Sequence, residues 1–148
     1  MKILLIEDDP YKSSDISSFL EKKYKDVIIQ IATSFNGAYL CAIEGNFDFF
    51  IVDMALPKFE VSPGSIEQPI ANGGEILVSA LQDAGVNPSF VVMTQYETFG
   101  SETKETISSR LEADCGDLFH GIIKYASNSD AWKVELEKVI NDVIYTNN

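Results

Sequence analysis

Short hydrophobic runs, rich in β-branched and aromatic residues, alternate along the chain with longer amphipathic stretches. The runs lie near residues 2–6, 27–32, 48–53, 89–94 and 120–124. Runs of this length and composition are typical of buried strands, and their alternation with helical stretches predicts βαβ units around a parallel sheet. We therefore expect an α/β fold.

The amphipathic stretches place their apolar residues at helical spacing. In the first stretch, Ile16, Phe19 and Leu20 share one face. In the last, the corresponding stripe consists of Trp132, Leu136, Val139, Ile140 and Val143. Such stripes indicate helices that cover a core. A further helix is predicted over Ser101 to Ala113, with Ile107 and Leu111 directed inward.

Polar residues follow several of the hydrophobic runs directly. The first run ends in Glu7-Asp8-Asp9, and Asp53 follows the third. Neighbouring parallel strands present their carboxyl ends at one edge of the sheet, so these carboxylates are expected to meet. Crowded carboxylates repel one another, and a hard cation such as Mg2+, which prefers oxygen ligands, relieves that repulsion.

Two further residues complete a set of polar strand ends. Thr94 closes the fourth run and Lys124 the fifth. The ordered set resembles the receiver domain of two-component response regulators, and the resemblance spans nearly the whole chain. The matching segments are Ile3 to Pro10, Asp53-Met54-Ala55-Leu56-Pro57, Met93-Thr94 and Ile123-Lys124.

The resemblance implies a flavodoxin-like (βα)5 doubly wound parallel sheet with strand order 2-1-3-4-5. Strands one and three then flank the point where the winding reverses, which is where open α/β sheets bind ligands. It also implies a metal site, in which Asp8, Asp53 and the backbone carbonyl of Ala55 hold Mg2+ and Glu7 acts through a bound water.

The same resemblance implies a phosphorelay function. Asp53 would be the nucleophile that accepts a phosphoryl group, while Thr94 and Lys124 would contact the phosphoryl oxygens. A histidine kinase or phosphotransfer protein would be the phosphodonor, and an unknown downstream protein would receive the signal. A homodimer is left open. The chain would not be an enzyme beyond its own phosphorylation and dephosphorylation.

Length, charge and cysteine content fit this interpretation. The 148 residues and 45% apolar content suit one receiver-like domain over residues 1–148. A net charge of −12 without a basic patch argues against direct nucleic-acid binding. No apolar stretch is long enough to span a membrane, and no signal peptide is recognisable. Cys41 and Cys115 lie far apart, which is typical of reduced thiols in a cytoplasmic protein.

The chain departs from the family pattern in several places. Lys58 to Asn72 is longer than the family's usual loop, so we expect an inserted loop at about 58–72, either a plain surface insertion or a lid. The position three residues before the family lysine usually holds an aromatic ring, and here it is Gly121. Tyr125 stands where a proline usually follows that lysine, so the usual switch would be rebuilt from another ring or be absent.

Two other functions remain open. The missing aromatic and proline residues favour a degenerate receiver that acts as a phosphorylation-independent binding module. A Mg2+-dependent phosphohydrolase uses the same residue types, but such enzymes generally carry an Asp-x-Asp motif after the first strand. Glu7-Asp8-Asp9 does not match that motif.

Overall fold

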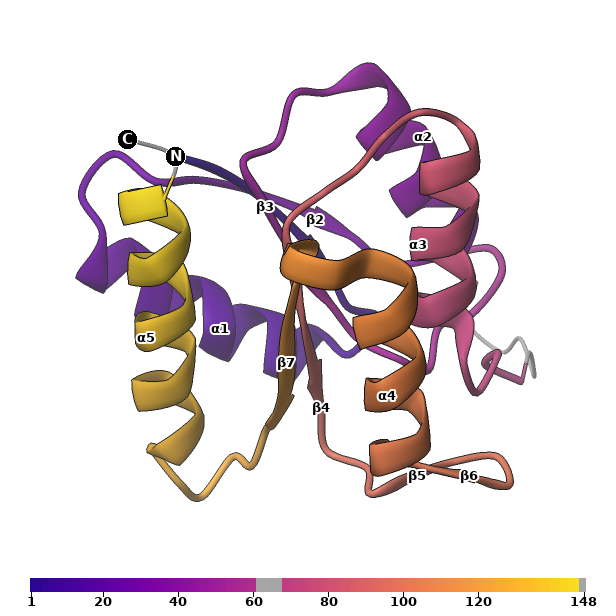
Figure 1. Ribbon diagram of the computed structural model, residues 1–148. Coiled ribbons are helices and arrows are strands. Elements are labelled where there is room, and N and C mark those ends of the chain that lie inside the picture. Colours follow the sequence, from indigo (N-terminus) through magenta and orange to yellow (C-terminus); the bar gives the residue numbers. More distant parts are fainter. Residues whose placement is uncertain (61–67, 147–148) are drawn as a thin grey trace.

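Five parallel strands form the central sheet of the protein. The computed structural model describes residues 1–60 and 68–146 (Figure 1). The strand order is β2-β1-β3-β4-β7, which confirms the predicted flavodoxin-like order because β7 is the fifth strand of this sheet. The strands are β1 Lys2–Ile6, β2 Ile28–Ala32, β3 Phe49–Val52, β4 Phe90–Thr94 and β7 Phe119–Lys124.

Helices cover both faces of the sheet. In Figure 1, α1 and α5 lie on one face, and α2, α3 and α4 lie on the other. The helices are α1 Pro10–Lys23, α2 Phe35–Glu44, α3 Gly73–Asp83, α4 Lys104–Cys115 and α5 Ala131–Thr146, and a short 3-10 turn, η1 Gly116–Leu118, follows α4. This two-sided cover explains why every residue of β3 and β4 is buried.

Successive residues of a strand pack alternately into two separate hydrophobic cores, one on each face of the sheet. Leu4 and Ile6 of β1 pack into the core beneath α2, α3 and α4, whereas Ile3 and Leu5 pack into the core beneath α1 and α5. The alternation follows from the two-residue period of a strand. Trp132 of α5 is buried in the second core, as the predicted stripe required.

The start of α1 is fixed by the acidic segment that precedes it. Asp9 is the N-cap, and its side chain accepts hydrogen bonds from the backbone N–H groups of Tyr11 (2.9 Å) and Lys12 (3.4 Å). Pro10 occupies the first helical position, where its missing N–H costs nothing. The helix therefore begins directly beside the carboxyl end of β1.

The helix predicted over Ser101 to Ala113 begins later than expected. Its first residues form a small antiparallel hairpin instead, β5 Thr98–Phe99 and β6 Glu102–Thr103. Gly100 makes the turn with a φ of 65°, and the side chain of Thr103 then caps α4 by accepting from the N–H of Thr106 at 3.3 Å. Ile107 and Leu111 are buried, as predicted.

An isolated β-bridge joins the segment after β3 to the residues that precede α3. Leu56 and Ile70 pair in antiparallel fashion, with N–H to O distances of 3.1 and 2.7 Å. Residues 61–67 of the expected insertion lie outside the described residues. Both the inserted loop at 58–72 and the single receiver-like domain over 1–148 stay predictions.

The described residues contain no helix that is both long and apolar enough to cross a membrane. Both cysteines are free thiols, Cys41 half-buried and Cys115 buried.

Candidate functional site

The carboxyl ends of β1 and β3 lie side by side at the edge where the sheet reverses its winding. Ile6 pairs with Val52, and the N–H of Asp53 donates to the carbonyl of Ile6 at 3.0 Å. The residues that follow these strands, Glu7 and Asp53, are therefore brought together by the strand register itself. This is the place where open α/β sheets bind ligands.

Three carboxyl groups converge here and form what we call the acidic pocket: Glu7, Asp8 and Asp53. Each offers a carboxylate oxygen, and these oxygens all lie within 4.8 Å of one another. Glu7 and Asp53 are buried, with 1% and 4% exposure, whereas Asp8 is exposed. The three residues form a group that is able to hold a metal ion.

Burial and mutual repulsion hold protons on this cluster. Burial, a hydrogen bond to Asp53 and the negative charge of Asp53 together raise the pKa of Glu7 to about 9, although the Lys12 ammonium acts in the opposite direction. Burial and the charge of Asp53 also raise the pKa of Asp8. These carboxyl groups therefore bind a proton more readily than free carboxylates do.

The donor set fits Mg2+. Both carboxylate oxygens of Glu7 are buried and accept no hydrogen bond of regular geometry among the described residues, and the one cation near them is the Lys12 ammonium, 3.2 Å from Oε1. A cation with its bound waters would satisfy such oxygens, and Mg2+ commonly binds through one or two carboxylates while it keeps several waters. Asp8, Asp53 and the half-buried Ala55, through its carbonyl, are the residues that would hold the ion.

Hydrogen bonds made by Met54, the residue after Asp53, fix the position of Asp53. One carboxylate oxygen, Oδ1, accepts from the N–H of Met54 at 2.9 Å. The carbonyl of Met54 accepts in turn from the N–H of Gly74 at 2.8 Å. The first turn of α3 thus fixes the backbone that carries Asp53.

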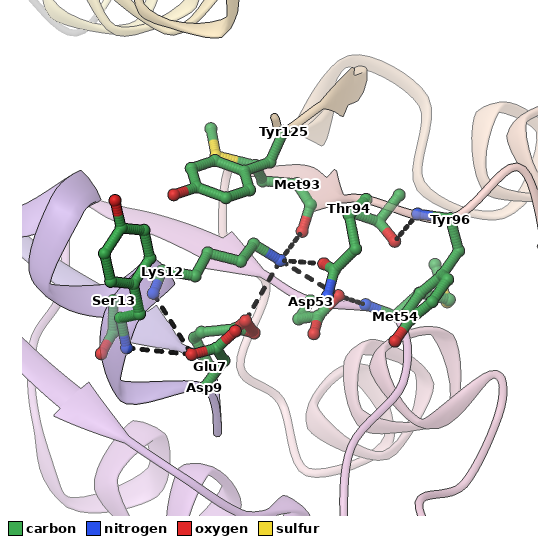
Figure 2. Close-up of polar contacts among 12 residues, drawn as sticks. Glu7, Asp9, Lys12, Ser13, Asp53, Met54, Met93, Thr94, Tyr96 and Tyr125 are labelled. Atoms are coloured by element: carbon green, nitrogen blue, oxygen red, sulfur yellow. Dashed lines mark hydrogen bonds and ion pairs between the residues drawn. The ribbon is translucent and has the colours of Figure 1, made fainter. Parts of the chain in front are cut away.

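Thr94 lies at the end of β4, the strand next to β3, and is 1% exposed. Its hydroxyl oxygen accepts from the N–H of Tyr96 at 3.2 Å, which leaves the hydroxyl proton available to donate (Figure 2). Its backbone carbonyl accepts from the N–H of Tyr125 at 2.9 Å. The predicted position at the end of the fourth sheet strand is therefore observed, while the predicted contact with a phosphoryl oxygen stays a prediction.

Lys124 lies across from Thr94 in the β4–β7 register, but its ammonium points elsewhere. The side chain is 59% exposed, and Nζ forms an ion pair with Oε1 of Glu97 at 3.0 Å. This partner lowers the pKa of Glu97. Within the described part of the chain, Lys124 makes no ion pair with Asp53. Its phosphoryl contact also stays a prediction.

A different lysine reaches the acidic pocket. Lys12 of α1 is 1% exposed, and its Nζ lies 3.2 Å from Oε1 of Glu7 and 3.4 Å from Oδ1 of Asp53. Figure 2 shows its side chain extending from α1 toward Asp53. Sequence reasoning missed this residue. The available signal was its place on the apolar stripe of α1, four and eight residues before the buried Ile16 and Leu20.

Comparison with solved structures identifies the fold. Chemotaxis response regulator CheY4 of Vibrio cholerae is 18% identical, with a TM-score of 0.65, and the match covers 93% of this chain and 97% of that one. The receiver domain of the Francisella response regulator 1452 is 15% identical, with a TM-score of 0.62 and coverage of 99% and 98%. This chain has the fold of a receiver domain.

A third similar structure is the response regulator protein TrrA of Thermotoga maritima, in complex with Mg2+-BeF. It is 16% identical, with a TM-score of 0.59, and the match covers 93% of this chain and 97% of TrrA. Among curated proteins, the uncharacterized protein y4jR of Sinorhizobium fredii (strain NBRC 101917 / NGR234) is 20% identical over 143 residues, which are 93% of this chain and 95% of the relative. No family model matches the chain.

The receiver fold carries its aromatic rings at unusual positions here. Gly121, where receivers usually have a ring, has a φ of 104°. Of the rings that could replace it, Phe119 and Tyr125 are buried, and Tyr96 is 52% exposed. The Lys124–Tyr125 peptide bond is trans, since no cis bond occurs in the described ranges.

Proposed function

We propose that this protein is a phosphorelay receiver that accepts a phosphoryl group on Asp53 in a Mg2+-dependent reaction and signals through protein–protein contacts. One observation carries the proposal. Asp53 is buried at the switch point of a receiver fold, between the carboxyl groups of Glu7 and Asp8 and a lysine ammonium at 3.4 Å. This arrangement combines an oxygen nucleophile with groups that bind a cation and groups that bind an anion.

The acidic pocket would hold the metal ion through Asp8, Asp53 and the carbonyl of Ala55, with Glu7 acting through a bound water. The bound ion would neutralise charge on the phosphoryl oxygens, which is the main requirement of such transfers. The chain's own residues position the nucleophile, because the Met54 N–H holds Asp53 Oδ1 at 2.9 Å. Thr94 would donate its hydroxyl proton to a phosphoryl oxygen.

The partners proposed from the fold are proteins. A histidine kinase or a phosphotransfer protein would be the phosphodonor, and an unidentified downstream protein would recognise the phosphorylated surface. The similar fold of TrrA holds Mg2+-BeF, and beryllofluoride is a mimic of the phosphoryl group. That complex supports the proposal that this chain binds Mg2+ and a phosphoryl group.

The proposal is tested by incubating the protein with acetyl phosphate and Mg2+ and measuring its intact mass. We expect one phosphoryl adduct in the wild type and none in Asp53→Asn. The exposed Asp83, at the end of α3, provides the matched control: Asp83→Asn should keep the adduct. An adduct that survives in Asp53→Asn, or no adduct in the wild type, contradicts the proposal.

A second function is favoured by the Lys12 contact. The Lys12 ammonium already neutralises charge on Asp53 in the absence of phosphate, as a phosphorylation-independent binding module would require. The two functions differ in the response to beryllofluoride with Mg2+. A binding module of this kind would hold its partner with the same affinity in the presence and absence of the mimic.

A further inference from the structure

Lys12 is a buried ammonium surrounded by oxygen atoms. Its Nζ donates to the carbonyl of Met93 at 2.9 Å and to Oε1 of Gln95 at 3.2 Å, besides its ion pairs with Glu7 and Asp53. A buried ammonium is costly unless it is paired and hydrogen-bonded, and these four oxygens meet that need. The position of the Lys12 ammonium is therefore fixed by its contacts with these four oxygens.

Tyr125 holds the lysine from the other side. Nζ lies 5.7 Å from the centre of the Tyr125 ring, within the range of a cation–π interaction. The ring is itself fixed, because the Tyr125 hydroxyl donates to Oδ2 of Asp15 at 2.7 Å. Lys12 is thus oriented before any ligand arrives, and an oriented charge stabilises developing charge without reorganisation.

Lys124 offers none of these features. Its ammonium is exposed and neutralised by the exposed Glu97 at 3.0 Å. Exposed pairs of this kind contribute little energy and are easily screened. The cation that touches the proposed acceptor comes from α1 and not from the end of β7.

We propose that Lys12 is the catalytic lysine of this receiver, the residue whose ammonium contacts the transferred phosphoryl group in place of Lys124. This inference rests on the proposed function. In the reaction with acetyl phosphate, one oxygen of Asp53 forms a bond to phosphorus while the bond from phosphorus to the acetyl oxygen breaks. Acetate leaves with the electron pair of that bond. Lys12 stabilises the negative charge on the phosphoryl oxygens during this exchange.

The position of Lys12 is compatible with a metal ion in the same site. Its ion pairs go to Glu7 and Asp53, and it makes no ion pair with Asp8 within the described residues. The exposed carboxylate of Asp8 and the carbonyl of Ala55 therefore remain available to Mg2+.

The test compares Lys12→Gln with Lys124→Gln, and Lys22→Gln serves as the control because Lys22 is exposed on the same helix as Lys12. The first measurement is the rate of adduct formation with acetyl phosphate and Mg2+. Removing a positioned donor at a reacting centre costs on the order of 100-fold. We expect a loss of that order in Lys12→Gln, and changes within about twofold in Lys124→Gln and Lys22→Gln.

The second measurement is ligand binding, followed by the fluorescence of Trp132. This ring lies 5.4 Å from the ring of Tyr125, which contacts Lys12. Lys12→Gln should weaken beryllofluoride binding in the presence of Mg2+. The same variant should bind Mg2+ alone as tightly as the wild type or more tightly, because a competing positive charge is gone. Weaker Mg2+ binding together with slower phosphorylation would mean that Lys12 only maintains the pocket, and would overturn the inference.

Removing Lys12 leaves Glu7 and Asp53 facing each other, so the single variant is at risk of unfolding. The double variant Glu7→Gln/Lys12→Gln removes one charge of each sign and is compared with Glu7→Gln alone, so that only the lysine differs. Lys12→Arg, which keeps the charge, should recover part of the rate. Unchanged rates in both Lys12→Gln backgrounds, with a large loss in Lys124→Gln, would overturn the inference and leave the proposed function intact. No adduct and no beryllofluoride response in the wild type would overturn both.

Discussion

At the scale of single residues, Tyr125 joins the pocket to the second core. Its ring packs against Trp132 and faces Lys12, and its hydroxyl donates to Asp15. Burial, the hydrogen bond to Asp15 and the charge of that carboxylate raise the pKa of the Tyr125 phenol above its ordinary value of 10.0. The neutral phenol is therefore part of the folded structure.

A pH dependence follows from this shift. The unfolded chain loses the phenol proton near its ordinary pKa while the folded chain retains it, so stability is lost as pH rises above about 10. The difference in phenolate absorbance between the wild type and Tyr125→Phe reports the titration of Tyr125. We expect this difference to appear at a higher pH than the titration of an ordinary tyrosine. The melting temperature of Tyr125→Phe should fall less steeply over the same range. Tyr145→Phe, which removes an exposed ring, is the control, and an ordinary titration of Tyr125 would contradict the expectation.

The residues of the site differ in how far they could be predicted. Glu7, Asp8, Asp53 and Thr94 were found because each lies at or just after the end of a buried strand, and parallel strands present their carboxyl ends together. Lys12 was not found, because a lysine in a helix is usually solvated, and three of its four partners, Met93, Gln95 and Asp53, are distant in the sequence.

At the scale of elements, the first turn of α3 is packed directly on the strand end that carries Asp53. A Cβ atom at Gly74 would lie 2.5 Å from the Asp53 carbonyl oxygen and 2.9 Å from Cγ1 of Val52. Since backbone atoms cannot yield easily, only glycine permits this approach. The close contact also allows the hydrogen bond from Gly74 to Met54.

Gly74→Ala should therefore destabilise the protein, although alanine is the better helix former. Overpacking of this kind costs about 1 to 3 kcal/mol. We expect that loss in urea unfolding, together with slower adduct formation because the Asp53 backbone is displaced. Ser79→Ala, at an exposed position of the same helix, should leave both measurements unchanged. If Gly74→Ala and the wild type had the same free energy of unfolding, the prediction would be wrong, because α3 would have moved to accommodate the added methyl group without loss of stability.

The strands of the main sheet could be predicted from their hydrophobic runs, but the hairpin β5–β6 could not. Each of its strands has only two residues, too few for a recognisable period. The side chain that fixes its place is Arg110 of α4, whose guanidinium contacts both Glu75 of α3 and Glu102 of β6. Such a contact between three elements depends on the fold and is not encoded in any local pattern.

At the scale of the whole molecule, ligand binding and stability are linked. A ligand that binds only the folded state adds about 2.7 kcal/mol when its free concentration is 100 times its Kd. For a chain of 148 residues this corresponds to a rise in melting temperature on the order of 5 to 10 °C. We expect such a rise with Mg2+ and beryllofluoride together.

The same experiment separates site binding from general ion effects. Asp53→Asn should lose most of the rise, while Asp83→Asn should keep it. An equal rise in Asp53→Asn would place the ligands elsewhere on this chain, whose net charge of −12 attracts cations in general.

The receiver fold by itself does not assign a function, because one fold supports many. The three similar structures described above share only 15% to 18% identity with this chain, and what they share with it is the fold. Function must come from the acidic pocket and from the cation beside it.

The Leu56–Ile70 bridge has a consequence for engineering. Two backbone hydrogen bonds join the ends of the intervening segment, and the next one, from the N–H of Gly73 to the carbonyl of Ile70 at 3.0 Å, ties this junction to α3. Closing a longer loop costs little extra entropy, about 0.6 kcal/mol for each doubling of its length. A short peptide tag inserted between these two residues should therefore add little to the free energy of closing the segment.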